Sequence, residues 1–195
     1  MNPNSPIAIA IEMKSALLII DVQVGIARSK EICAGWPTII GNIAKLISDA
    51  RSNNVPVIFV QHDGTPGDLL EPGCEGWALC PELGVKASDT ASDTVIRKSA
   101  CDSFYGTNLE VTLRNLGVTR LIVTGCMTEF CVDTSVRRAV SLGFDVTLVS
   151  DAHGTWNSAA LDAGKIIEHH NGLLNQFSAG RATVTVTPSR AVAFA

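Results

Sequence analysis

The position of Cys131 suits a nucleophile. An apolar run at 121–124 (LIVT) stops at Gly125, and Cys131 comes shortly afterwards, where a helical pattern begins. A helix N-terminus carries unpaired N–H groups and the positive end of the helix dipole, which favour a thiolate and can hold an oxyanion. A buried structural cysteine is the competing interpretation, because free cysteines in folded proteins are usually buried.

Two charged residues also stand at the ends of predicted strands. Asp21 directly follows an apolar run at 16–20, and Lys98 follows a short strand predicted at 94–97. Ligands of open parallel sheets bind at the carboxyl ends of the strands, so these residues are expected to meet Cys131 there. Together they would supply a general base, a cation that lowers the thiol pKa, and a nucleophile. Taken singly, Asp21 could be a turn cap and Lys98 a solvated charge.

The sequence lacks the motifs of several other kinds of site, and the remaining candidates fit catalysis less well. No two glycines stand two residues apart, which excludes a G-x-G-x-x-G fingerprint, and there is neither a P-loop nor a G-x-S-x-G elbow. The six cysteines include no C-x-x-C pair, so no structural zinc site is indicated. Asp151 with His153 as base is the nearest competing pair, whereas His169 and His170 fit a solvated helix end.

The composition is that of a globular protein. Of the 195 residues, 46% are hydrophobic and 17% are charged. A net charge of −4 without a Lys/Arg cluster argues against nucleic acid, and no apolar run reaches the roughly 18 residues of a membrane span. No secretory signal is apparent, so a cytoplasmic location with reduced cysteines is predicted. Whether Cys74 and Cys80 form a disulfide is left open.

The order of the apolar segments predicts the α/β class. We expect a three-layer α/β/α, Rossmann-like, six-stranded and mostly parallel sheet with helices on both faces. Residues 1–12 are interpreted as an N-terminal extension and 13–195 as a single domain, in which 61–92 is the longest irregular stretch. Strands are expected at 16–20, 55–60, 94–97, 118–124, 146–149 and 182–186, and helices at 37–50, 108–116, 129–142 and 157–177, the last capped by Asn157.

Three blocks of the sequence resemble the isochorismatase-like cysteine hydrolases, the superfamily of nicotinamidases and N-carbamoylsarcosine amidases. The blocks are LLIIDVQ at 17–23, KSACDSFYGTNL at 98–109 and GCMTEFCV at 125–132. They occur in the family's order, and the resemblance covers roughly residues 13–186. It is specific for the superfamily and much less so for a substrate.

The resemblance implies a catalytic triad of Asp21, Lys98 and Cys131. Cys131 would attack a carbonyl carbon while Asp21 takes the thiol proton and later returns it to the departing nitrogen. Lys98 would hold Asp21 and stabilise the thiolate. The family's non-proline cis peptide falls on the Cys126–Met127 bond, and the backbone N–H groups of Met127 and Cys131 would form the oxyanion hole.

Departures from the family pattern narrow the chemistry. Nicotinamidase-type members carry a metal-binding pattern like Gln-Asp-x-His, where this chain has QHDG at 61–64. We therefore predict no metal and no cofactor, and nicotinamide is a less favoured substrate. Cys131 favours C–N hydrolysis over cleavage of isochorismate, which does not depend on a cysteine. The alternatives are an isochorismatase-type or nicotinamidase-type hydrolase, a catalytically silent binding module, or a thiol sensor pairing Cys131 with Cys126 or Cys101.

The predicted activity is therefore cysteine-dependent hydrolysis of a small amide, ureido or cyclic amide. The partners expected are a small-molecule substrate and further copies of the chain, as a dimer or tetramer. Trp77 and Tyr105, although near the predicted catalytic edge, could equally lie in the core or at a subunit contact. Five residues on loops at that edge are candidates for the substrate pocket: Trp36, His62, Trp77, Phe104 and Tyr105.

Overall fold

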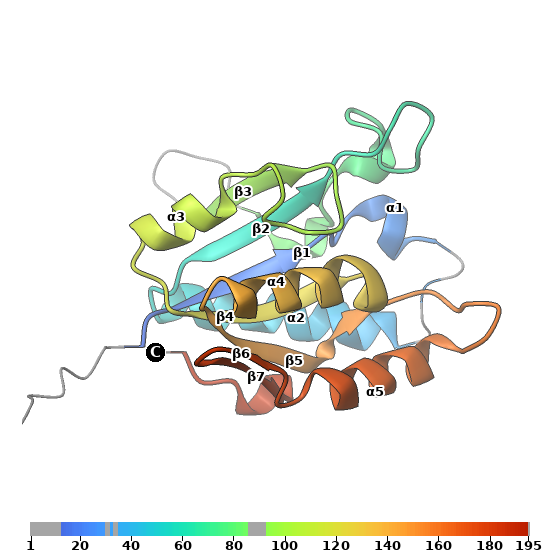
Figure 1. Ribbon diagram of the computed structural model, residues 1–195. Coiled ribbons are helices and arrows are strands. Elements are labelled where there is room, and N and C mark those ends of the chain that lie inside the picture. The colour runs from blue at the N-terminus through green and yellow to red at the C-terminus, as the bar shows by residue number, and fades with distance from the viewer. Residues whose placement is uncertain (1–12, 30–31, 33–34, 86–92, 195) are drawn as a thin grey trace, which may run out of the picture.

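A seven-stranded sheet forms the centre of the molecule (Figure 1). The computed structural model describes residues 13–29, 32, 35–85 and 93–194, so the predicted extension at 1–12 lies outside the described residues. All six expected strands are present. The strands lie in the order β3-β2-β1-β4-β5-β7-β6, with β1 Ser15–Ile20, β2 Val57–His62, β3 Asp93–Lys98, β4 Arg120–Cys126, β5 Asp145–Gly154, β6 Ser178–Ala179 and β7 Ala182–Thr187.

The sheet is mostly parallel, as predicted. Every neighbouring pair from β3 to β7 is parallel, whereas β6 pairs antiparallel with β7 at the edge. The expectation of six strands missed β6 because two residues are too few to give an alternating pattern.

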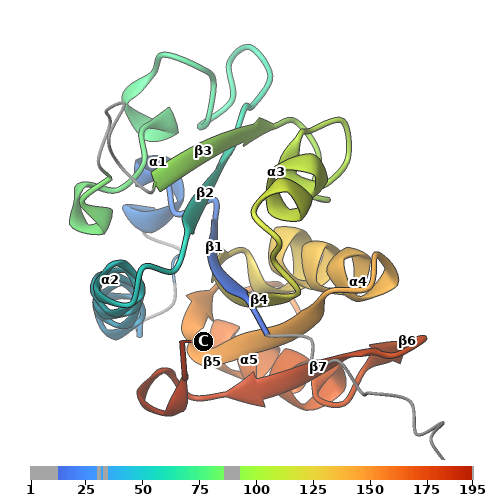
Figure 2. The same cartoon turned by 90° about the vertical axis from the view of Figure 1, so that its left-hand side faces the viewer.

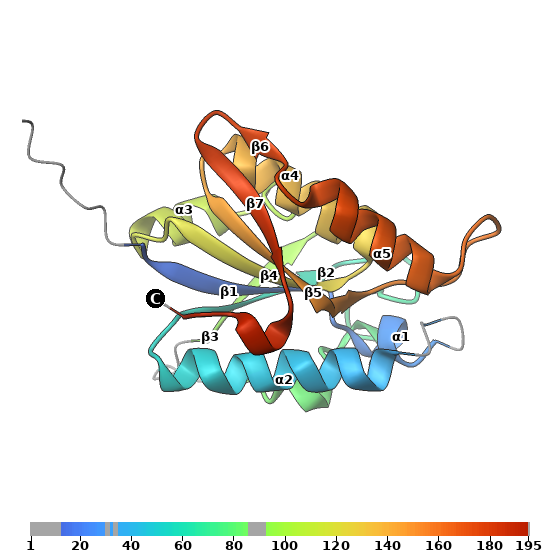
Figure 3. The same cartoon turned by 90° about the horizontal axis from the view of Figure 1, so that it is seen from below.

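Helices cover both faces of the sheet, which confirms the three-layer arrangement. Figures 2 and 3 show α2 along one face and α3, α4 and α5 along the other. The side chains of β1 alternate between the two layers, since Leu17 and Ile19 pack with α2 while Leu18 and Ile20 pack with α3 and α4. The helices are α1 Val24–Ala27, α2 Trp36–Ser52, α3 Leu109–Asn115, α4 Asp133–Ser141 and α5 Ala163–Leu174.

The strand order reverses between β1 and β4, and the site lies at this point of the sheet. From β1 the chain adds β2 and β3 on one side, and then β4, β5 and β7 on the other. Gly125 of β4 pairs with Ile20 of β1 at a φ of 120°, and a Cβ there would lie 2.0 Å from the Ile20 carbonyl oxygen. Glycine thus allows β4 to approach β1 closely where both strands end.

The segment before α5 differs from the prediction. Asn157 was expected to cap this helix, but the cap is Asp162, whose Oδ1 accepts a hydrogen bond from the Lys165 N–H at 2.9 Å. Asn157 instead stays in the preceding loop, where its Oδ1 accepts from the Ala163 N–H at 2.8 Å. Both residue types suit an N-cap, so the local pattern alone did not identify which one starts the helix.

Candidate active site

Asp21 begins the turn that leaves β1. Its φ of 50° is unusual for a residue other than glycine, and it turns the chain sharply at the sheet edge. The backbone N–H of Asp21 still bonds to Val60 O of β2, at 3.0 Å. Only 1% of the residue is exposed, so its carboxyl group lies in the protein interior. A carboxylate held there needs a charged partner or a chemical role.

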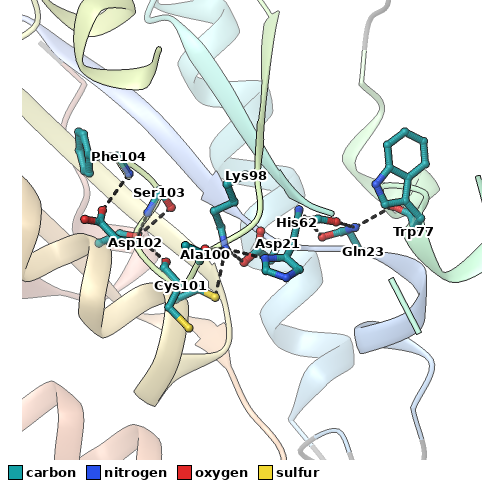
Figure 4. A network of polar contacts seen from close by, with 12 residues as sticks. Asp21, Gln23, His62, Trp77, Lys98, Ala100, Cys101, Asp102, Ser103 and Phe104 are labelled. Atoms are coloured by element: carbon teal, nitrogen blue, oxygen red, sulfur yellow. Dashed lines mark hydrogen bonds and ion pairs between the residues drawn. The ribbon is translucent and has the colours of Figure 1, made fainter. Parts of the chain in front are cut away.

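Lys98 is that partner, and it joins the residues predicted to act together (Figure 4). Its side chain is fully buried, and its Nζ lies 2.6 Å from Asp21 Oδ2 and 3.2 Å from Cys131 Sγ. The ammonium also donates to Ala100 O at 2.9 Å and lies 3.3 Å from His62 Nδ1. The structure therefore brings Asp21, Lys98 and Cys131 together around one ammonium group.

Cys131 lies in a π-helical turn, Thr128–Val132, between β4 and α4. The sequence indicated an α-helix from about residue 129, but α4 begins only at Asp133. The Cys126–Met127 peptide bond is cis, as the resemblance implies. Met127, which directly precedes this turn, and Cys131, which belongs to it, both line the cavity beside Asp21.

The electrostatics of Cys131 differ from the expectation. Burial raises the pKa of the Cys131 thiol, the Asp21 charge raises it further, and Lys98 offsets only part of the increase. Lys98 lowers the thiol pKa, as predicted, but burial and the Asp21 charge outweigh it, so the expected net decrease in this pKa is not found. A cysteine beside a buried carboxylate is stable as the thiol, so it requires a base when it reacts.

The Asp21 carboxyl group is suited to be that base. Burial raises the pKa of Asp21, and the Lys98 charge opposes this without cancelling it. Burial lowers the pKa of Lys98, but its interactions with Asp21 and Cys131 outweigh the burial and the pKa lies above its usual value. The increased proton affinity of the Asp21 carboxylate favours transfer of the thiol proton to it. The Lys98 cation stabilises the thiolate that this transfer leaves on Cys131.

A cavity of about 240 Å³ opens beside Asp21 and Cys131. Most of its wall is apolar, while His62 and Asp68 supply polar groups. Asp68 and Leu70 belong to the long irregular stretch at 61–92, which therefore contributes a wall of the cavity. The residues not predicted from the sequence are Ile26, Asp68, Leu70, Cys101 and Phe130.

The predicted pocket residues divide into two groups. His62 lines the cavity. The four aromatic candidates are not among the described residues that line it. Trp36 is buried at the start of α2, where its ring packs against Gly154. Phe104 stacks on Phe144 in the core, with 6.3 Å between ring centroids. Tyr105 is 72% exposed and lines a separate hollow near Arg97 and Asp63.

Trp77 has a structural role next to the site, through its hydrogen bonds. Its carbonyl oxygen accepts hydrogen bonds from Gln23 Nε2 at 2.8 Å and Gln61 Nε2 at 2.9 Å, and its indole N–H donates to Asp63 at 2.9 Å. The Arg97 guanidinium lies 5.1 Å from the centroid of its ring. Trp77 thus connects the loop that follows β2 to the ends of β2 and β3.

The two residues of the competing pair, Asp151 and His153, have different hydrogen-bond partners. His153 is fully buried, with Nδ1 2.9 Å from Thr128 Oγ1 and Nε2 3.0 Å from Asn171 Oδ1. Asp151 instead accepts two hydrogen bonds from Ser189. Burial lowers the pKa of His153 to about 4. The neutral His153 therefore has a structural role, because it contacts Thr128 at the start of the π-helical turn.

Other predicted features concern metals, membranes and disulfides. Within the described ranges, no group of three or more His, Cys, Asp or Glu side chains could hold a metal ion. None of the described helices has the length and apolar character required to cross a bilayer. Cys74 and Cys80 are both free thiols in the structure.

Comparison with known proteins shows which family the chain resembles. Residues 15–186 match the family model of the isochorismatase domain. An uncharacterised isochorismatase family protein of Bacillus subtilis is 35% identical over 182 residues, covering 90% of this chain and 94% of that relative. The crystal structure of an isochorismatase from Pseudomonas putida has a TM-score of 0.79 and 29% identity, covering 92% of this chain and 90% of that one.

A streptothricin hydrolase of Streptomyces noursei is also similar. It is 34% identical over 156 residues, which cover 80% of this chain and 60% of the relative. A second streptothricin hydrolase of the same organism is covered over 51% of its length. The chain therefore spans little more than half the length of these two relatives.

Proposed function

The chain belongs to the isochorismatase family, and on this basis we propose that it is a cysteine hydrolase that cleaves a C–N bond of a small amide, ureido or cyclic amide substrate. One observation carries the proposal: the buried Lys98 ammonium contacts both Asp21 and Cys131. Asp21 and Cys131 also line the same cavity, whose volume of about 240 Å³ suits a small molecule.

The first step is attack by Cys131 on the carbonyl carbon of the substrate. Asp21 takes the thiol proton as the S–C bond forms, and the carbonyl electrons move to oxygen. The backbone N–H groups of Met127 and Cys131 bind this oxyanion. Loss of one such donor typically costs about a hundredfold in rate. Lys98 stays cationic throughout and limits the build-up of negative charge around the sulfur.

The second step breaks the C–N bond. The protonated Asp21 gives its proton to the departing nitrogen, which leaves as an amine or as ammonia, and a thioester remains on Cys131. Asp21 then removes a proton from a water molecule that attacks the thioester carbon. The acid is released, the thiolate leaves beside Lys98, and Asp21 returns the proton to sulfur. No cofactor takes part.

The same residues favour this chemistry over the alternatives. A vinyl ether hydrolase has no need of a nucleophilic sulfur, whereas the Cys131 thiol lies at the wall of the cavity beside a base. A nicotinamidase-type site would need metal ligands at the exit of β2, where the chain has His62, Asp63 and Gly64. A silent binding module would have no need of a buried lysine–carboxylate pair next to a thiol.

The proposal extends to the whole protein. We infer that 13–195 acts as a single domain in the cytoplasm and that copies of it assemble into a dimer or tetramer. The free thiols of Cys74, Cys80 and Cys101 fit a reducing compartment. Large exposed apolar side chains, among them Val111, Phe130 and Leu173, fit contacts between copies.

The test is a panel of primary amides, ureido compounds and cyclic amides. Ammonia release and product masses report turnover, and rapid acid quenching followed by intact-mass analysis reports an acyl group on the protein. We expect at least one substrate class to be hydrolysed, with the acyl mass located by peptide mapping on Cys131. The proposal fails if the panel yields neither product nor adduct while the folded protein still binds a panel compound.

The pH dependence of kcat/KM follows from the pKa directions of the site. The reactive form contains the Asp21 carboxylate, the Cys131 thiol and the Lys98 cation. Because the Asp21 pKa is raised, activity should fall with decreasing pH at a higher pH than an ordinary carboxyl group would give. The raised pKa values of Cys131 and Lys98 should keep activity level well above neutral pH. A rate that increases with pH near the usual thiol pKa would instead indicate a preformed thiolate.

A further inference from the structure

His62 is a polar residue of the cavity that the triad mechanism leaves without a role. It ends β2 directly opposite Lys98, its register partner on β3. The side chain of Gln23 fixes its backbone on both sides, because Oε1 accepts from the His62 N–H at 2.9 Å and Nε2 donates to the His62 carbonyl at 3.0 Å. Figure 4 shows this arrangement beside Asp21. The imidazole is therefore attached to a rigid part of the site.

The contact with Lys98 determines which ring nitrogen carries the proton. An ammonium group has only donors, so a hydrogen on His62 Nδ1, which lies 3.3 Å from Lys98 Nζ, would face another donor. The contact therefore favours the tautomer with the hydrogen on Nε2. Burial and the Lys98 charge lower the pKa of His62, although Asp21, Asp68 and Asp63 oppose them, and this keeps the ring neutral. Among the described residues none accepts a hydrogen bond from Nε2.

We propose that His62 is a substrate-binding residue whose Nε2–H donates a hydrogen bond to a second oxygen of the substrate, beyond the carbonyl that Cys131 attacks. The Lys98 ammonium contacts both groups, with Nζ 3.2 Å from Cys131 Sγ and 3.3 Å from His62 Nδ1. This proposal rests on the proposed C–N hydrolase function and narrows it to one class of substrate.

The spacing selects that class. When Cys131 attacks one carbonyl, the His62 ring lies a single ammonium group away on the wall of the same cavity. A second carbonyl attached through one nitrogen, as in an acylurea or a cyclic imide, spans such a separation. A simple amide has no oxygen to place there. The site therefore favours acylurea and cyclic imide substrates over simple amides.

Two thiol reagents test this without any turnover. Chloroacetamide carries one carbonyl, whereas chloroacetylurea carries a second carbonyl across one nitrogen. The rate of adduct formation on Cys131 is measured by mass spectrometry for both, and each rate is divided by that for free glutathione. The wild-type protein should prefer chloroacetylurea by roughly tenfold, as expected for one well-placed hydrogen bond. Because the result is a ratio, changes in general thiol reactivity cancel.

Three substitutions separate the two ring nitrogens. His62→Gln places an amide N–H near the position of Nε2 and should retain most of the preference for chloroacetylurea. His62→Asn places an amide oxygen near Nδ1, which preserves the contact with Lys98 but supplies nothing at Nε2. This variant and His62→Ala should both lose the preference. Nitrogen NMR of histidine-labelled wild-type protein should show Nε2 protonated and Nδ1 unprotonated, which needs no variant to fold.

The outcomes are distinct. No preference in the wild-type protein, an unchanged preference in His62→Ala, or an Nδ1–H tautomer would each overturn the role of His62. Failure of the hydrolase proposal would appear differently, as absence of turnover with the whole amide panel. In that case the ratio of the two reagents still reports whether His62 recognises a second carbonyl.

Discussion

Replacement of Cys131 by alanine is expected to abolish hydrolysis and the acyl adduct, whichever substrate of the panel is used. Alanine leaves Asp21 and Lys98 in place but supplies no atom to carry the acyl group. Cys131→Ser should retain less than about a thousandth of the wild-type kcat/KM, because a hydroxyl is far harder to deprotonate than a thiol and Asp21 is a weak base. Initial rates and intact masses measure both effects.

Cys74→Ser is the matched control for the Cys131 variants. Cys74 is an exposed free thiol outside the described lining of the cavity. Its replacement removes one sulfur and should leave kcat/KM and the acyl adduct unchanged. Equal loss of activity in Cys74→Ser and Cys131→Ser would assign the effect to something other than the proposed nucleophile. Thermal unfolding of each variant shows whether the fold is retained.

The strands along the chain and the residues at their ends could be predicted because each leaves a local signal. Asp21 follows five apolar residues, and a carboxylate there has few roles other than pairing or catalysis. The alternation of strands and helices indicated a parallel sheet, whose carboxyl edge collects these residues. That edge is where the structure brings Asp21, Lys98 and Cys131 together.

The electrostatics of the site could not be predicted in this way. The thiol pKa depends on how deeply Cys131 is buried and on its distance from Asp21, which is 110 positions away in the sequence. A helix start and a lysine both suggested a lowered pKa, but burial and the carboxylate have the larger effect. The sign of the shift is a balance of large terms that only the three-dimensional arrangement determines.

Most of the residues that line the cavity also could not be predicted from the sequence. Trp36 and Phe104 are near the catalytic edge in sequence, yet both side chains turn into the core. Asp68 and Leu70 line the cavity because Trp77, farther along the same stretch, fastens it to β2. Such contacts join residues with no shared periodicity. A local signal was available only for Phe130, a large apolar residue directly before Cys131.

The position of Lys98 shows why the strand order matters for the mechanism. Lys98 ends β3, which is separated from β1 by β2. Its long side chain must therefore pass His62 at the end of β2 to reach Asp21, and the contact with His62 Nδ1 follows from this path. The same geometry that holds the base also orients the imidazole of His62 towards its proposed role in binding.

Asp21→Asn is expected to cost both activity and stability. The amide cannot accept the thiol proton, so kcat/KM should fall at least about a thousandfold. The Lys98 side chain, which is fully buried, would then lack its counter-charge. Removing one partner of a buried ion pair typically costs about 3 to 5 kcal/mol of the free energy of unfolding. Chemical denaturation measures the loss of unfolding free energy, and steady-state kinetics measure the fall in kcat/KM.

The double variant Asp21→Asn with Lys98→Met separates these two effects. It removes both charges and keeps side chains of similar volume, so most of the lost free energy of unfolding should return, since no unpaired charge remains buried. Activity should stay as low as in Asp21→Asn, because neither the base nor the cation is restored. A double variant as unstable as the single one would show that the pair is not coupled in the folded protein. Recovery of activity would show that catalysis does not depend on proton transfer to Asp21.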